Sequence, residues 1–272
     1  MSYGWRGVLG MVSPTYRVGS LERFIRMLPE GIGVIPFYGG AVRSGTEAEL
    51  RRALEVAEEK VALLAELGAD VISVDGAPPV MLQGYRGALE VVERLQGKYG
   101  KPISTAPVSQ IEAFQALGVR RLAGITYFPE ELNRKFAQFF VEAGYEVLAM
   151  EGYPTAFTDA GKIPAGDIYA FAKKVFRQTK GADCVYMMGG GWDPLSIVAT
   201  LERDLGVPVV AALPAKMRAV LKRLGVHEME IQELLGHESL RTTRGYIHIR
   251  TEELRRAVNL LASTRGAQET DP

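Results

Sequence analysis

Short apolar runs alternate with longer amphipathic stretches from the start of the chain to about residue 225. This alternation favours βαβ units and a parallel sheet, because a strand buried on both faces reads as an apolar run and its crossover helix as an amphipathic one. The apolar runs, each a predicted strand, lie at residues 6–12, 31–37, 69–75, 102–105, 119–126, 145–150, 182–188 and 207–212.

The two halves of this pattern echo each other. Residues 68–78 and 181–191 both begin Gly-Ala-Asp, continue as an apolar run and end in a turn of small residues. Strand 6–12 likewise parallels strand 119–126. We therefore predict an α/β fold of two pseudo-symmetric Rossmann-like lobes with parallel sheets, plus a short helical C-terminal tail. The predicted domains are a first lobe of residues 1–105 plus 207–225, a second lobe of residues 106–206, and a tail of residues 226–272.

Composition excludes several kinds of site and partner. Lys plus Arg and Asp plus Glu both number 32, so no net charge attracts the chain to nucleic acid or to an anionic membrane, and we expect neither as a partner. The chain shows no signal peptide and no membrane-spanning run, which predicts a cytoplasmic protein. The three histidines all follow residue 226, which excludes a Ser-His-Asp triad or a histidine metal site from the main body.

Cofactor motifs and cysteine pairs are missing from the sequence as well. There is neither a G-x-G-x-x-G fingerprint nor a Walker A motif, so we predict no nicotinamide, flavin or ATP and no other cofactor. The single cysteine, Cys184, excludes an intrachain disulfide and a site with several cysteine ligands.

Small-residue turns follow two equivalent predicted strands. Backbone N–H groups in the turns Gly76-Ala77 and Gly189-Gly190-Gly191 can approach an anion closely, although such turns can also serve only to reverse the chain. Asp75 ends its strand just before the first turn. Burial there would let its carboxyl group exchange a proton near neutral pH, or the side chain could simply cap the turn.

Several segments resemble one known group of enzymes. Residues 103–105, the run Gln115–Leu122, Thr126-Tyr127 and Asn133 are similar to the central segment of maleate isomerases and arylmalonate decarboxylases, within the aspartate/glutamate racemase superfamily. Residues 205–210 and the helix expected at 214–224 resemble their last strand and helix. The resemblance covers about residues 6–225. It implies a cofactor-independent isomerase, racemase or decarboxylase that acts on a small carboxylic or dicarboxylic acid.

The chain departs from this group at its catalytic cysteines. Those positions align with Gly76 and Gly189, and Cys184 lies five residues earlier within an apolar strand, where a buried and inert thiol is expected. Two interpretations remain: an enzyme in which Asp75 and Tyr127 act in place of the thiols, or a carboxylate-binding protein without catalytic activity.

The resemblance also suggests which residues contact the ligand. Tyr127 matches a ligand-facing tyrosine whose hydroxyl donates to a carboxylate, with a core tyrosine as the alternative. Asn133 would hold the same loop or contact the ligand, Tyr38 is a candidate wall residue by alignment, and Trp192 could line an apolar pocket or pack in the core. The predicted substrate-binding residues are Ser13, Pro14, Gly76, Ala77, Asn133, Gly189, Gly190 and Gly191.

The tail is similar to a different family. Residues 231–248 and 253–258 resemble the C-terminal end of tyrosine recombinases, in which the residues matching His237 and Tyr246 serve phosphoryl transfer. That chemistry needs a shell of cationic residues, and the chain has no H-x-x-R box, so we interpret the tail as a gene fusion without recombinase activity. Helices expected at 228–235 and 251–262 are amphipathic enough to dock on the body or on a neighbouring subunit, and we expect a homo-oligomer.

Overall fold

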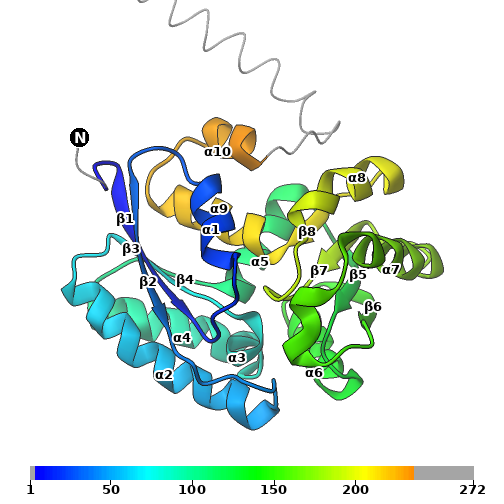
Figure 1. Cartoon of the computed structure of the whole chain (residues 1–272), viewed down its shortest axis with the longest axis horizontal. Coiled ribbons are helices and arrows are strands. Elements are labelled where there is room, and N and C mark those ends of the chain that lie inside the picture. The colour runs from blue at the N-terminus through cyan, green and yellow to red at the C-terminus, as the bar shows by residue number, and fades with distance from the viewer. Residues whose placement is uncertain (1–3, 236–272) are drawn as a thin grey trace, which may run out of the picture. The chain divides into compact units, whose positions relative to one another are not determined.

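The computed structural model describes residues 4–235 and contains two four-stranded parallel sheets, one from each half of the chain (Figure 1). The first sheet has the order β2 (Ile32–Tyr38), β1 (Gly7–Ser13), β3 (Val71–Val74) and β4 (Ile103–Thr105). The second has the order β6 (Glu146–Gly152), β5 (Arg121–Thr126), β7 (Cys184–Met187) and β8 (Val209–Ala211). The two orders are equivalent, which confirms the predicted pair of pseudo-symmetric lobes, and every predicted strand is present within two residues at each end.

Helices connect the strands and cover the sheets. They are α1 (Ser20–Met27), α2 (Glu47–Glu66), α3 (Ala77–Met81), α4 (Gly84–Tyr99), α5 (Ala106–Leu117), α6 (Glu130–Glu142), α7 (Ala165–Gln178), α8 (Leu195–Leu205), α9 (Ala212–Arg223) and α10 (Glu228–Leu235), with a 3₁₀ turn, η1 (Phe157–Lys162). Helices α5 and α9 pack against each other, and each contacts strands of both sheets. They therefore form part of the junction between the lobes.

The last strand corrects one boundary. We assigned residues 207–225 to the first lobe, but β8 pairs with β7, and Val185 N donates to Pro208 O at 3.0 Å. All three residues of β8 are buried, as befits a strand inside the second lobe. The prediction was wrong for the strand because periodicity identifies a buried strand without identifying its neighbour in the sheet. Helix α9, in contrast, returns to contact β3 and β4.

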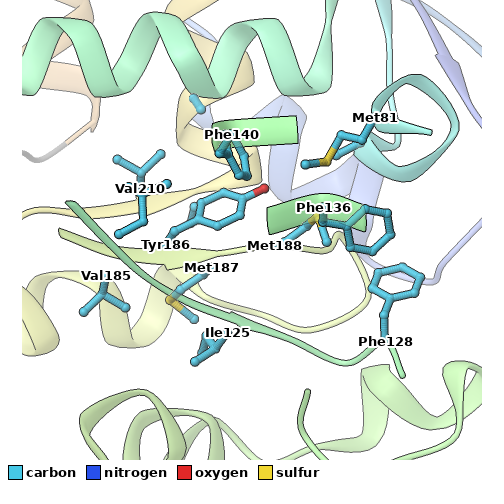
Figure 2. Close-up of a cluster of buried hydrophobic side chains, with 14 of the residues drawn as sticks. Met81, Ile125, Phe128, Phe136, Phe140, Val185, Tyr186, Met187, Met188 and Val210 are labelled. Carbon is cyan, nitrogen blue, oxygen red and sulfur yellow. The ribbon is translucent and has the colours of Figure 1, made fainter. Parts of the chain in front are cut away.

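Apolar side chains from both lobes form one continuous cluster. It includes Met81 of α3 from the first lobe together with Phe136 of α6 and Met188 of the second, which lie near one another in Figure 2. Tyr186 packs edge to face against Phe140, with ring centroids 4.9 Å apart. Burial of this shared cluster holds the two lobes together.

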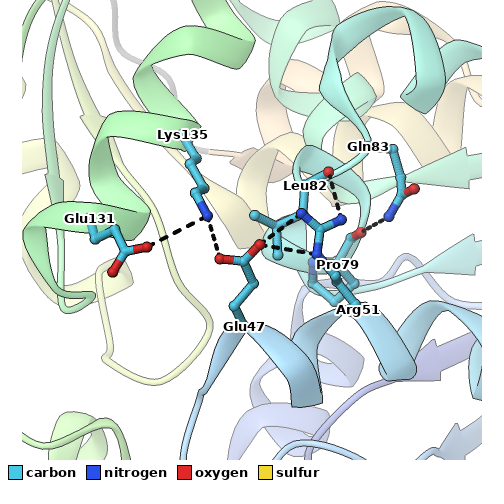
Figure 3. Close-up of polar contacts among 7 residues, drawn as sticks. All are labelled: Glu47, Arg51, Pro79, Leu82, Gln83, Glu131 and Lys135. Atoms are coloured by element: carbon cyan, nitrogen blue, oxygen red, sulfur yellow. Dashed lines mark hydrogen bonds and ion pairs between the residues drawn. The ribbon is translucent and has the colours of Figure 1, made fainter.

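An ion pair also links the lobes at the surface. Glu47, in the first turn of α2, bonds to Arg51 one turn along its own helix and to Lys135 of α6 in the other lobe (Figure 3). The hydrogen bond from Lys135 holds the pKa of Glu47 below its ordinary value. Solvent-exposed pairs add little stability, so this contact mainly fixes how α2 meets α6.

Thr46 caps the start of α2, because its side chain accepts a hydrogen bond from Glu49 N at 3.4 Å. We expect Thr46→Ala to lower the free energy of unfolding by about 1 kcal/mol, since one helix N–H loses its acceptor. Thr46→Ser, which keeps the hydroxyl group, is the matched control and should remain close to the wild type in urea unfolding. Equal losses in both variants would contradict a capping role.

Helix α10 confirms the predicted helix at 228–235 and its docking on the body. Ile231 is fully buried in a cluster with residues of α9, and Arg6 Nη1 lies 2.8 Å from Glu230 Oε1. The helix expected at 251–262, as well as His237 and Tyr246, lies outside the described residues. Within the described range, no helix is long and apolar enough to cross a membrane.

Candidate functional site

A cavity of about 170 Å³ lies where the carboxyl ends of the two sheets meet. An engineered protein cavity of about 150 Å³ binds benzene, so a cavity of this volume suits a small acid. The predicted site residues in its wall are Ser13, Pro14, Asp75, Gly76, Ala77, Tyr127, Gly189 and Gly190. These residues come from the carboxyl ends of β1, β3, β5 and β7.

Asp75 lies in a dense polar cluster on the first lobe. Because β1 and β3 are parallel neighbours, their carboxyl ends bring Ser13 and Asp75 side by side, and Asp75 N donates to Val12 O at 2.8 Å. Asp75 Oδ1 accepts from Ser73 Oγ at 2.8 Å, and Oδ2 accepts from Ser13 Oγ at 2.8 Å. Both carboxylate oxygens are thus already bonded.

Lys216 of α9 completes this cluster, and the sequence analysis missed it. Its Nζ lies 2.7 Å from Asp75 Oδ2, and the residue is only 7 % exposed. Nζ also lies 4.0 Å from the ring centroid of Phe24 and 3.9 Å from the weakly accepting Sδ of Met11. The signal was available, since Lys216 lies three residues after Leu213 and four before Val220, on the apolar stripe of the helix.

Tyr127 follows β5 of the second lobe and lines the cavity as predicted. Its hydroxyl oxygen accepts from Gly191 N at 2.9 Å, and no protein acceptor for its own proton lies among the described residues. Burial raises the pKa of Tyr127 above its ordinary value, so the hydroxyl keeps that proton at neutral pH. The group is therefore ready to donate a hydrogen bond to a ligand.

Gly76 and Gly189 lie where any side chain would meet a neighbouring residue. Gly76 has φ +84°, and a Cβ there would lie 2.6 Å from Pro14 Cγ. Gly189 has φ +118°, and a Cβ there would lie 2.7 Å from Tyr127 Cζ. Pro14, which follows β1, fills the space next to Gly76, and Tyr127, which follows β5, fills the space next to Gly189. A cysteine at either glycine would therefore require a strained backbone and a shift of the neighbouring side chain.

Two arginines extend the positive charge of the cavity wall, and the sequence analysis missed both. Arg17 stacks over Phe157, with its guanidinium carbon 4.7 Å from the ring centroid, and donates to Phe157 O at 3.1 Å. Arg23 lies 3.7 Å from Asp193. In the part of the chain that the structure describes, no carboxylate pairs with Arg17.

The wall also contains N–H groups without acceptors. Trp192 lines the cavity at 2 % exposure, and its buried Nε1–H has no partner among residues 4–235. Neither Gly189 N nor Gly190 N makes a hydrogen bond to a described residue. A buried donor without an acceptor, such as Trp192 Nε1, costs about 1–3 kcal/mol, which an anionic ligand would recover. The amides of the half-buried Gly189 and the exposed Gly190 face the open part of the wall, where a ligand can reach them.

Three other candidates lie outside this wall. Asn133 borders a different, more open hollow, and its amide bonds to Thr126 Oγ1 and Phe128 O, at 2.7 and 2.9 Å. It therefore holds the loop, which was one of its two predicted roles. Gly191 N donates a hydrogen bond to the hydroxyl of Tyr127. Tyr38 packs edge to face against Tyr16, with ring centroids 5.0 Å apart.

Cys184 is located where the sequence predicted, within β7 and fully buried. Burial raises the pKa of its thiol far above the ordinary value, so the thiolate is not formed at neutral pH. The thiol is not part of the cavity wall.

Comparison with known proteins identifies the family of this chain. Residues 36–233 match the arylmalonate decarboxylase family. The arylmalonate decarboxylase of Bordetella bronchiseptica is 25% identical over 192 residues, which cover 69% of this chain and 75% of that protein.

Solved structures show the same fold. A mutant of arylmalonate decarboxylase in the liganded form has a TM-score of 0.73 at 22% identity, covering 80% of this chain and 93% of the other. The maleate isomerase Iso from Pseudomonas putida reaches 0.75 at 18% identity, with 81% and 93% covered. The Nocardia farcinica maleate cis-trans isomerase bound to TRIS reaches 0.72 at 19%, with the same coverage. From the family match over most of its length, this chain belongs to the arylmalonate decarboxylase family.

Proposed function

We propose that this chain is an isomerase or lyase that binds a small carboxylic or dicarboxylic acid in the cavity between the lobes, without a cofactor and without a catalytic thiol. The observation that carries this proposal is the surplus of donors in the wall. The Tyr127 hydroxyl, the Trp192 indole and the amides of Gly189 and Gly190 all lack acceptors among the described residues. A carboxylate supplies oxygen acceptors without adding a donor.

The charged residues of the cavity wall support a substrate with a second anionic group. Lys216 pairs with Asp75 in this wall, and Arg17 lies beside Phe157, whose backbone carbonyl is its only hydrogen-bond acceptor among the described residues. A guanidinium group can bind a carboxylate through two parallel hydrogen bonds. The chemistry is proton transfer at the carbon next to a carboxylate, in which Tyr127 and the glycine amides stabilise charge on the carboxylate oxygens and the Asp75 cluster provides the acid–base group.

A screen of small acids tests this proposal. The full chain is mixed with maleate, aspartate, glutamate and phenylmalonate, and its melting temperature and the proton NMR spectrum of each acid in D₂O are measured. Stabilisation together with isomerisation, loss of carbon dioxide or α-deuteration supports an enzyme. Stabilisation by an acid that stays unchanged supports the alternative, a carboxylate-binding protein, which is favoured by the glycines at both cysteine positions.

Tyr127→Phe should weaken carboxylate binding about tenfold, because one hydrogen bond from a buried hydroxyl to a charged group is lost. The ring remains, so the packing against Gly189 should persist. Isothermal titration with the acid selected by the screen measures the dissociation constant. Unchanged affinity would show that the hydroxyl group does not contact the ligand.

A further inference from the structure

We propose that Lys216 is the proton donor of this site and that Asp75 is its positioning residue, an inference that rests on the proposed function. Lys216 is a buried cation in the cavity wall, and Asp75 Oδ2 at 2.7 Å is its only oxygen partner among the described residues. Its other neighbours are the ring of Phe24 and the sulfur of Met11, neither of which is a strong acceptor. The ammonium group therefore has N–H donors left for a bound substrate.

The cluster around Asp75 suits this division of roles. Ser73 and Ser13 donate to its two oxygens, and the salt bridge fixes the position of Lys216 Nζ. Because all these neighbours donate to it, Asp75 acts as the hydrogen-bond acceptor of the cluster. Lys216, in contrast, is the donor of the pair, since an ammonium group has N–H donors and no acceptor.

An ammonium donor suits a lyase step better than a racemisation, which also requires a base. In the decarboxylation of a malonate, the bond from Cα to one carboxylate breaks, carbon dioxide leaves, and the electron pair stays on Cα as an enediolate. Lys216 Nζ then gives its proton to Cα, which forms the new C–H bond. The neutral amine regains a proton from water, so each turnover converts one malonate dianion and one proton into a monocarboxylate and carbon dioxide.

The test uses phenylmalonate as the probe and compares the full-length wild type with Lys216→Ala and Lys222→Ala. Lys222 lies on the same helix but is exposed, so it is the matched control and should keep the wild-type rate. Removal of a general acid lowers kcat by about 10²–10⁴-fold. We expect a loss of at least about 100-fold in Lys216→Ala, measured as release of carbon dioxide.

Chemical rescue separates proton donation from a structural role. Added ethylamine or methylamine should restore part of the lost kcat in Lys216→Ala, with a rate that depends on the pKa of the added amine. A lysine needed only for packing would give no such dependence, and that result would overturn the proposal. Lys216→Ala leaves Asp75 without its cation, so the single variant could fail to fold. The double variant Asp75→Asn/Lys216→Ala removes both charges and keeps the test valid in that case. We expect it to fold, to be inactive and to regain activity with added amines.

The two possible failures can be told apart. If the wild type decarboxylates phenylmalonate and Lys216→Ala does so at the same rate, the role of Lys216 is overturned and the proposed function stands. A wild type that neither binds nor converts phenylmalonate or any acid of the screen would overturn both.

Discussion

Lys216→Met is expected to lower the free energy of unfolding by about 3–5 kcal/mol, because removing one partner leaves the other charge of a buried pair uncompensated. Asp75 would keep its bonds to Ser13 and Ser73 but lose the cation 2.7 Å from Oδ2. Urea unfolding followed by circular dichroism measures the difference.

The double variant Asp75→Asn/Lys216→Met should recover most of this loss, since replacing both members of a buried pair with neutral groups is often close to neutral. The exposed Lys222→Met on the same helix should change stability by less than about 0.5 kcal/mol. If Lys216→Met were as stable as Lys222→Met, the pair would not be buried as described.

Gly189→Cys should lower the free energy of unfolding by about 2–5 kcal/mol, with contributions from overpacking and from a positive φ. The new Cβ would overlap the ring of Tyr127, at 2.7 Å from Cζ, and the backbone there has φ +118°. A cysteine at this position would therefore displace Tyr127, and we expect no gain of thiol-dependent activity.

Gly190→Cys is the matched control for this change. The neighbouring glycine would place its Cβ in open space, with no atom within 4 Å, and its φ is not positive. Its stability should stay within about 0.5 kcal/mol of the wild type. Equal stability of Gly189→Cys and Gly190→Cys in urea unfolding would contradict the close packing of Tyr127 against Gly189.

The sequence predicted the frame of the site well, because strand periodicity and strand-end turns are local signals. Asp75, Tyr127 and the two glycine turns lie at the ends of three predicted strands, and the lobes then bring those ends together. The same local nature of these signals explains why β8 was assigned to the wrong lobe. A three-residue strand carries no information about which sheet it joins.

The residues that the sequence analysis missed come from elements far from those turns. Lys216 reaches Asp75 across 141 positions of the chain, and Arg17 reaches Phe157 across 140. Such pairs depend on tertiary packing, which hydrophobic periodicity does not encode. The position of Lys216 on an apolar helix face could have predicted a buried ion pair, since a buried lysine needs a charged or hydrogen-bonding partner.

The most direct test of the carboxylate site is an amide NMR titration of the full-length chain with phenylmalonate. The account predicts that the backbone signals of Gly76, Gly189 and Gly190 shift together along one saturable curve, and that Tyr127→Phe weakens this curve. Shifts confined to residues around Asn133, or no saturable shift at the glycine turns with any acid of the screen, would contradict the claim that this cavity binds a carboxylate.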